Sequence, residues 1–232
     1  MFYFDPVYFL FLLPGMALSM WASFRVKSAF NKYSKVPVST GLSGAQAARA
    51  MLDRAGLHDV QIGRAGGFLS DHYNPATRSL ALSSPVYDSN SIAAVGVATH
   101  EAGHAIQHAQ HYAPLKLRSM LVPTASIGSN LGYIVMAVGL MMASQGVFMA
   151  GVALFSMVIL FQVVTLPVEF DASNRAKELV LSYGIVSQNE RQGMDRVLNA
   201  AALTYVAAAI SSLLTLLYFL FRAGLLGGRR DD

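Results

Sequence analysis

The sequence contains no cysteine and few charged residues. Without cysteine the chain can form no disulfide and offers no thiolate, so any metal site must use histidine and carboxylate side chains. Asp, Glu, Lys and Arg make up only 13% of the 232 residues, while 54% are hydrophobic. A soluble domain usually carries about 25% charged residues. Together with a mean hydropathy of +0.44, these values indicate an integral membrane protein with a modest polar portion.

The sequence carries a small excess of positive charge. Its net charge is +4, and its predicted isoelectric point is near 9.4. In a membrane protein such an excess reflects basic loops on one side of the bilayer. We therefore expect the protein to interact with the lipid bilayer and not to bind nucleic acid. Nothing in the sequence indicates an oligomeric state.

Four apolar runs are each long enough to cross a bilayer: 2–24, 121–143, 147–168 and 203–221. The first lacks a basic segment before it, so it does not resemble a cleaved signal peptide. Pro14 favours a kink within that run. The second contains small and weakly polar residues suited to close helix contacts: Ser126, Gly128, Ser129, Asn130 and Gly132. The sequence thus predicts a mostly α membrane protein, one domain over 1–232, with about four transmembrane helices and a small α+β polar portion.

Basic residues predict how these runs are oriented. Four of them directly follow the first run: Arg25, Lys27, Lys32 and Lys35. By the positive-inside rule this end is cytoplasmic and the N-terminus lies outside. The second and third runs form a hairpin, so the polar portions 25–118 and 169–202 share the cytoplasmic side. Of the 17 Lys and Arg, 14 then lie inside. The other three would lie outside, against the rule, unless the last run is re-entrant or buried; four spans remain the leading prediction. These three are Arg222, Arg229 and Arg230.

The polar portion before residue 118 shows helix and strand patterns. Residues 44–55 predict an amphipathic helix between a Ser43 cap and a Gly56 stop. Residues 60–62 suit a short strand. Runs 66–73 and 78–83 flank the turn signal Asn-Pro-Ala-Thr and predict a β-hairpin. This hairpin is either scaffold or an edge that pairs with an extended peptide substrate.

The stretch His100-Glu101-Ala102-Gly103-His104 carries the clearest chemistry. It lies in a predicted helix over about 91–110, in which positions four apart share a face. His100 and His104 can therefore hold one metal ion, while Glu101 is turned about 100° from His100. This is the layout of a zinc hydrolase, in which two imidazoles bind Zn²⁺ and a carboxylate takes a proton from the activated water.

Residue spacing alone does not identify the third protein ligand of the metal. In one metalloprotease class a further Gly and His follow at fixed positions, but here Gln107 and Gln110 replace them, and His111 comes one residue late. His108 shares a face with His104, although one straight helix rarely supplies three ligands around a tetrahedral ion. We expect His108 and His111 to support the site or to lie on the surface.

Glu169 is the better candidate, because the predicted membrane hairpin returns it to the side where His104 lies. It follows Pro167 and would stand in the first turn of a new helix. Asp171 is the reserve ligand. Either Asp171 or Ser173 could instead accept a hydrogen bond from an imidazole N–H.

Three motifs resemble the YugP-type neutral zinc metallopeptidases, a bacterial membrane family: H-E-A-G-H-A-I-Q-H, P-V-E-F-D-A-S-N-R-A and L-T-Y-V-A-A-A. The layout is also similar to that of the HtpX and CAAX-prenyl-protease superfamily. The resemblance implies one Zn²⁺ held in a gluzincin-like manner by His100, His104 and Glu169, with Glu101 as catalytic base. Related enzymes carry Asp four residues after the ligating Glu, where this chain has Ser173, so the surroundings of the ligands must differ.

The leading hypothesis is a multi-pass endopeptidase of the bacterial inner membrane, with its site at the cytoplasmic face and a peptide or protein as substrate. Three residues are candidates for stabilising the oxyanion: Arg175, Tyr205 and His72. A second hypothesis is a membrane adaptor with a structural zinc and His108 as fourth ligand. A third is a zinc hydrolase acting on a non-peptide bond.

Overall fold

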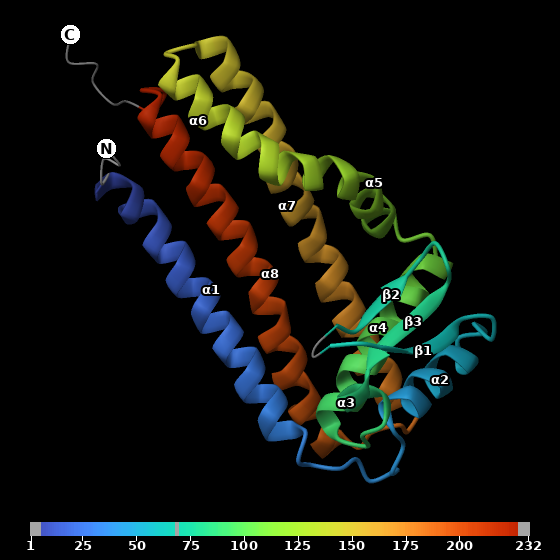
Figure 1. The fold of residues 1–232 in the computed structure, drawn as a ribbon. Helices are drawn as coiled ribbons and strands as arrows, with labels where there is room; N and C mark the ends of the chain where they lie inside the picture. The colour runs from blue at the N-terminus through green and yellow to red at the C-terminus, as the bar shows by residue number, and fades with distance from the viewer. Residues whose placement is uncertain (1–5, 68–69, 227–232) are drawn as a thin grey trace. The chain divides into compact units, whose positions relative to one another are not determined.

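The computed structural model describes residues 6–67 and 70–226. Four helical segments are long and apolar enough to cross a membrane: α1 (Pro6–Tyr33), the segment Ala113–Met141, α7 (Gln145–Ser182) and α8 (Gln188–Arg222). A small three-stranded sheet accompanies them. The predicted fold class is thus confirmed (Figure 1). Parts of the sequence predictions lie outside the described residues, namely 2–5 of the first run, 68–69 of the first hairpin run, and Arg229 and Arg230.

The chain divides into two compact units. The helical unit comprises the described part of Met1–Ala22, Leu117–Leu166 and Thr204–Asp232. The α+β unit comprises the described part of Ser23–Lys116 and Pro167–Leu203.

The long helices extend well beyond the apolar runs that predicted them. α7 continues without a break through Pro167 to Ser182. The prediction that Glu169 begins a new helix is therefore wrong. A proline inside a helix removes one backbone hydrogen bond, but Val168, Ala172 and Ala176, which follow it, are fully buried. We attribute the continuity of the helix to this packing, which offsets the lost bond.

In the α+β unit, α2 (Gly44–Arg54) has the predicted Ser43 cap, and the side chain of Gln46 completes a capping box. The strands are β1 (Gln61–Ala65), β2 (His72–Asn74) and β3 (Ser79–Ser83), in the order β1-β3-β2. β2 and β3 pair antiparallel as the predicted hairpin, with Tyr73 opposite Leu80, while β1 pairs parallel to β3. α3 (Ser84–Tyr87) follows the sheet. Since β2 lies at the end of the order, its outer edge has no strand partner among the described residues.

The central element of this unit is α4 (Ile92–Ala109), which is buried along most of its length. The hydroxyl of Ser91 accepts a hydrogen bond from the Ala94 N–H and caps its start. α4 lies against the sheet and α2 (Figure 1). Two glycines of α4 mark close contacts with the other helices of the unit, because Gly96 faces Met194 of α8 and Gly103 faces the backbone of Ala172 on α7.

In the helical unit, the segment from 113 to 141 is interrupted. α5 (Ala113–Ile127) passes into a π-helix, η1 (Gly128–Gly132), and then into α6 (Tyr133–Met141). Gly128 and Gly132 face the backbones of Leu154 and Phe155 on α7, and a methyl group on either would clash with them. These glycines therefore allow close helix packing, as small residues do within membranes.

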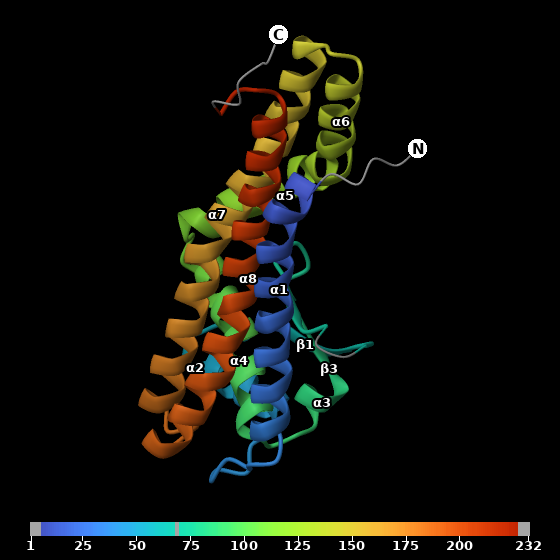
Figure 2. The same cartoon turned by 90° about the vertical axis from the view of Figure 1, so that its left-hand side faces the viewer.

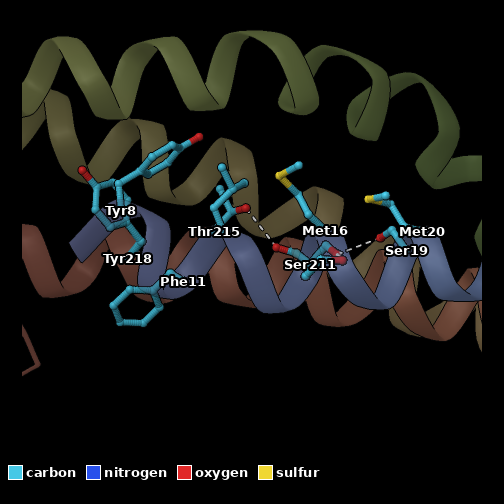
Figure 3. A pocket seen from close by; sticks show the side chains of 10 residues that line it. Tyr8, Phe11, Met16, Ser19, Met20, Ser211, Thr215 and Tyr218 are labelled. Atoms are coloured by element: carbon cyan, nitrogen blue, oxygen red, sulfur yellow. Dashed lines mark hydrogen bonds between the residues drawn. The ribbon is translucent and has the colours of Figure 1, made fainter. Parts of the chain in front are cut away.

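α1 and α8 lie side by side in the helical unit (Figure 2). Gly15 of α1 meets Ser211 of α8, whose hydroxyl lies 3.3 Å from that of Ser19. A cavity of about 290 Å³ opens between these helices, with Tyr8 and Tyr218 in edge-on contact in its wall (Figure 3). The Ser211 hydroxyl donates to the Gly15 carbonyl of α1 at 3.2 Å, and the Thr215 hydroxyl donates to the Ser211 carbonyl of its own helix at 2.9 Å.

Candidate metal centre

Two helices of the α+β unit bring the predicted ligands together. α4 presents His100 and His104 on one face, with their ring centroids 4.8 Å apart. α7 approaches α4 closely at Gly103, where an added methyl carbon would lie 2.7 Å from the Ala172 carbonyl oxygen. This approach places Glu169, one turn before Ala172, against both imidazoles.

The three side chains point their donor atoms at one another. The Oε2 atom of Glu169 lies 3.2 Å from Nε2 of His100 and 3.6 Å from Nε2 of His104. The donor atoms of the three residues all fall within 4.8 Å of one another. Four ligands at 2.0–2.2 Å around a tetrahedral zinc lie about 3.3–3.6 Å apart. The spacing and the donor set, two imidazoles and a carboxylate, therefore fit a zinc ion.

The other imidazole nitrogens are held by neighbouring side chains. Nδ1 of His100 lies 3.1 Å from the Ser173 hydroxyl, and Nδ1 of His104 lies 2.9 Å from Oε1 of Gln107. The Gln107 amide nitrogen donates to Asp171 and to the Val168 carbonyl, so its oxygen accepts from the His104 ring. These contacts assign the proton of His104 to Nδ1 and leave Nε2 free to bind a metal.

Gln107 is a residue that sequence reasoning missed. It is fully buried, yet in the sequence it counts only as a departure from a glycine-containing pattern. Its position three residues after His104 was the available signal, because side chains three apart on a helix are neighbours. Asp171 lies behind Gln107, and Ser173 contacts His100 directly. Ser173 thus lies where it can support an imidazole, whereas Asp171 reaches His104 only through Gln107.

Glu101 is buried beside these ligands, with 8% of its surface exposed. Within the described residues its carboxylate forms no hydrogen bond or ion pair. Burial opposes protonation of His104, but the Glu169 and Glu101 carboxylates outweigh it and raise the pKa of this imidazole. The same negative potential favours a divalent cation.

The candidate oxyanion residues lie in different places. Arg175 bonds to Asp171 and Gln110, and its guanidinium lies over the ring of Tyr112. His72 is exposed on β2, with Nδ1 2.9 Å from the Ser70 carbonyl oxygen. Tyr205 lies on α8 in the helical unit. His72 is not a member of the ligand cluster.

His108 and His111 also lie apart from the ligand cluster. Nδ1 of His108 lies 2.8 Å from the Tyr73 hydroxyl. His111 stands at the end of α4 with a φ of 53°. Both histidines and Tyr73 line a separate cavity of about 240 Å³.

Comparison with known proteins agrees with this geometry. Residues 8–224 match the family described as "Putative neutral zinc metallopeptidase". The chain belongs to this family. It is also 47% identical over 212 residues to a protein of Bacillus subtilis (strain 168) named "Putative membrane protease YugP", and the match covers 91% of this chain and 94% of that relative. No solved structure matches the chain. The zinc metallopeptidase family and the four long apolar helices together identify a membrane protein of the zinc peptidase class.

Proposed function

We propose that this protein is a membrane-embedded zinc endopeptidase in which His100, His104 and Glu169 hold the metal and Glu101 is the general base. One observation carries the proposal. Donor atoms from α4 and α7 lie within 4.8 Å of one another, with the Glu169 Oε2 at zinc-ligand spacing from both imidazoles, and the buried Glu101 carboxylate on α4 forms no hydrogen bond with a described residue. An unpaired buried carboxylate is costly unless the protein uses it.

The reaction follows from these side chains. When bound, zinc supplies a Lewis acid that polarises the peptide carbonyl and acidifies a water molecule. Glu101 accepts the proton of that water on its carboxylate and then delivers it to the leaving amine nitrogen. Gln107 holds the His104 ring with its proton on Nδ1, and Ser173 contacts Nδ1 of His100, so both rings turn Nε2 toward Glu169. Burial of Glu101 and Glu169 limits the access of bulk water to the proton transfer.

Strand β2 supports the choice of an extended peptide as substrate. Its outer edge has no strand partner among the described residues, and it lies alongside α4, to which Tyr73 of β2 is joined by the contact with His108. A strand edge along the helix that carries two of the metal ligands can bind a peptide by backbone hydrogen bonds. Such binding does not depend on side chains, so it suits a protease that acts on segments of any sequence.

The location of the site belongs to the same proposal. The cluster of basic residues after the first apolar run favours the cytoplasmic face of the bacterial inner membrane for the α+β unit. A site in this place would act on proteins at or near the inner surface of the bilayer.

The first experiment is to measure zinc per chain and cleavage of casein by the purified full-length protein, for wild type, Glu169→Ala and Glu178→Ala. Glu178 is an exposed carboxylate on the same helix and serves as the matched control. We expect about one zinc and cleavage for wild type and Glu178→Ala, and loss of both for Glu169→Ala. Zinc retained by Glu169→Ala would remove Glu169 as a ligand. Zinc without cleavage of any peptide would favour the structural-zinc adaptor instead.

A further inference from the structure

The second membrane-crossing segment carries one carboxamide, Asn130, and the contacts among the described residues leave it unused. Asn130 is exposed, within the π-helix η1. It stands twelve residues after Arg118 and twelve before Met142, where the helix ends. At 1.5 Å per residue each stretch spans about 18 Å, and the hydrocarbon core is about 30 Å thick. Asn130 therefore lies near the middle of the bilayer.

The packing of η1 determines where this side chain points. Gly128 and Gly132 both contact α7, and each is two residues from Asn130. Two residues correspond to roughly half a turn of helix, so the Asn130 side chain points away from α7. Ile127, Leu131 and Ile134, its neighbours on the outer surface, are 57%, 46% and 55% exposed. Asn130 is thus a carboxamide within an apolar surface.

The Asn130 carboxamide forms no hydrogen bond with any described residue. The adjacent hydroxyl differs, because Ser129 donates to the Ser126 carbonyl of its own helix at 2.9 Å. Lipid tails offer no donor or acceptor, and a polar group left unpaired in hydrocarbon is costly. Polar residues at such positions mark a functional contact.

We propose that the surface formed by Ile127, Asn130, Leu131 and Ile134 is the contact between two copies of this chain. A membrane fixes every copy in the same orientation and at the same depth, so Asn130 of one copy meets Asn130 of the other at one height across a twofold axis. A carboxamide carries both a donor and an acceptor. Two of them satisfy each other, while the surrounding aliphatic side chains pack around the pair.

The absence of cysteine allows a direct test in native membranes. Ile134→Cys, one turn after Asn130, places a single thiol on the proposed contact. Leu213→Cys on α8 is the matched control, because Leu213 is 47% exposed within another membrane helix. Mild copper-catalysed oxidation followed by non-reducing electrophoresis measures the disulfide-linked dimer, which forms only when the two Cα atoms come within about 7 Å.

We expect Ile134→Cys to give at least fivefold more dimer than Leu213→Cys. Adding Asn130→Leu should reduce this dimer at least fivefold, while Asn130→Gln, which keeps the amide, should preserve most of it. Leucine partitions favourably into the lipid hydrocarbon, so the Asn130→Leu variant should still fold. Its zinc content measures whether it does. Equal yields at both cysteines, or no effect of Asn130→Leu, would overturn the proposal. A cross-link to a different polypeptide in place of the dimer would also overturn it.

Discussion

Nε2 of His100 lies 3.2 Å from Oε2 of Glu169, although 69 positions separate the two residues in the sequence. The intervening chain includes two apolar segments long enough to cross a membrane. The return of α7 after these segments thus completes a ligand set that α4 alone provides only in part.

Replacing Glu101 with glutamine separates catalysis from metal binding. Glutamine keeps the size of the side chain but cannot accept and deliver the proton. General acid–base catalysis contributes about 10²- to 10⁴-fold. We therefore expect Glu101→Gln to retain about one zinc per chain while cleavage falls by at least 10²-fold. Metal analysis and a casein assay on the same preparation measure the two quantities. Cleavage at the wild-type rate would rule out Glu101 as the base.

Replacing Gln107 with alanine should weaken zinc binding without removing a ligand. The change leaves Nδ1 of His104 without its acceptor and lets the ring turn. Loss of such a supporting contact typically costs 10- to 100-fold in metal affinity. Competition with a chelator measures the zinc Kd, and the visible spectrum of the cobalt-substituted protein reports the geometry of the ligands.

Gln110→Ala is the control for Gln107→Ala. Gln110 lies at the end of the same helix and bonds to Arg175, not to a ligand. Its removal should leave the zinc Kd within about twofold of wild type. Equal losses of affinity for both variants would mean that the effect arises from the helix as a whole.

Much of this arrangement could be predicted from the sequence, because its signals are local. The i, i+4 spacing placed His100 and His104 on one face of a helix. The Ser43 cap predicted helix α2, and the turn at Asn74 predicted the β2–β3 hairpin. The choice of Glu169 as third ligand followed from the number of predicted membrane crossings, which returns it to the side where His104 lies. The continuation of α7 through Pro167 and the role of Gln107 could not be predicted, since both depend on packing between helices distant in sequence.

Gly103 is expected to be the glycine of α4 that cannot be replaced. A methyl group there would lie 2.7 Å from the Ala172 carbonyl oxygen, which is fixed in the backbone of α7. At Gly96 the nearest atom is 3.2 Å away and belongs to the flexible Met194 side chain. Both changes gain about 1 kcal/mol of helix propensity, so the difference between them isolates the clash.

We therefore expect Gly103→Ala to be about 1–3 kcal/mol less stable than Gly96→Ala. It should also lose zinc, because α7 and Glu169 are pushed away from α4. Thermal unfolding in detergent and metal analysis measure the two effects. Normal zinc content in Gly103→Ala would show that the helices can separate here without disturbing the ligands.

The proposed orientation can be tested with single cysteines, since the natural chain has none. Met142, 65% exposed, lies in the turn between α6 and α7, and Ala76 lies exposed in the turn between β2 and β3. If the α+β unit is cytoplasmic, a membrane-impermeant maleimide should label Met142→Cys in cells whose outer envelope has been permeabilised while the inner membrane stays intact. Ala76→Cys should react only after that membrane is permeabilised, because the bilayer separates it from the reagent. The reverse pattern would place the metal centre outside the cytoplasm, and its substrates would then be exported proteins.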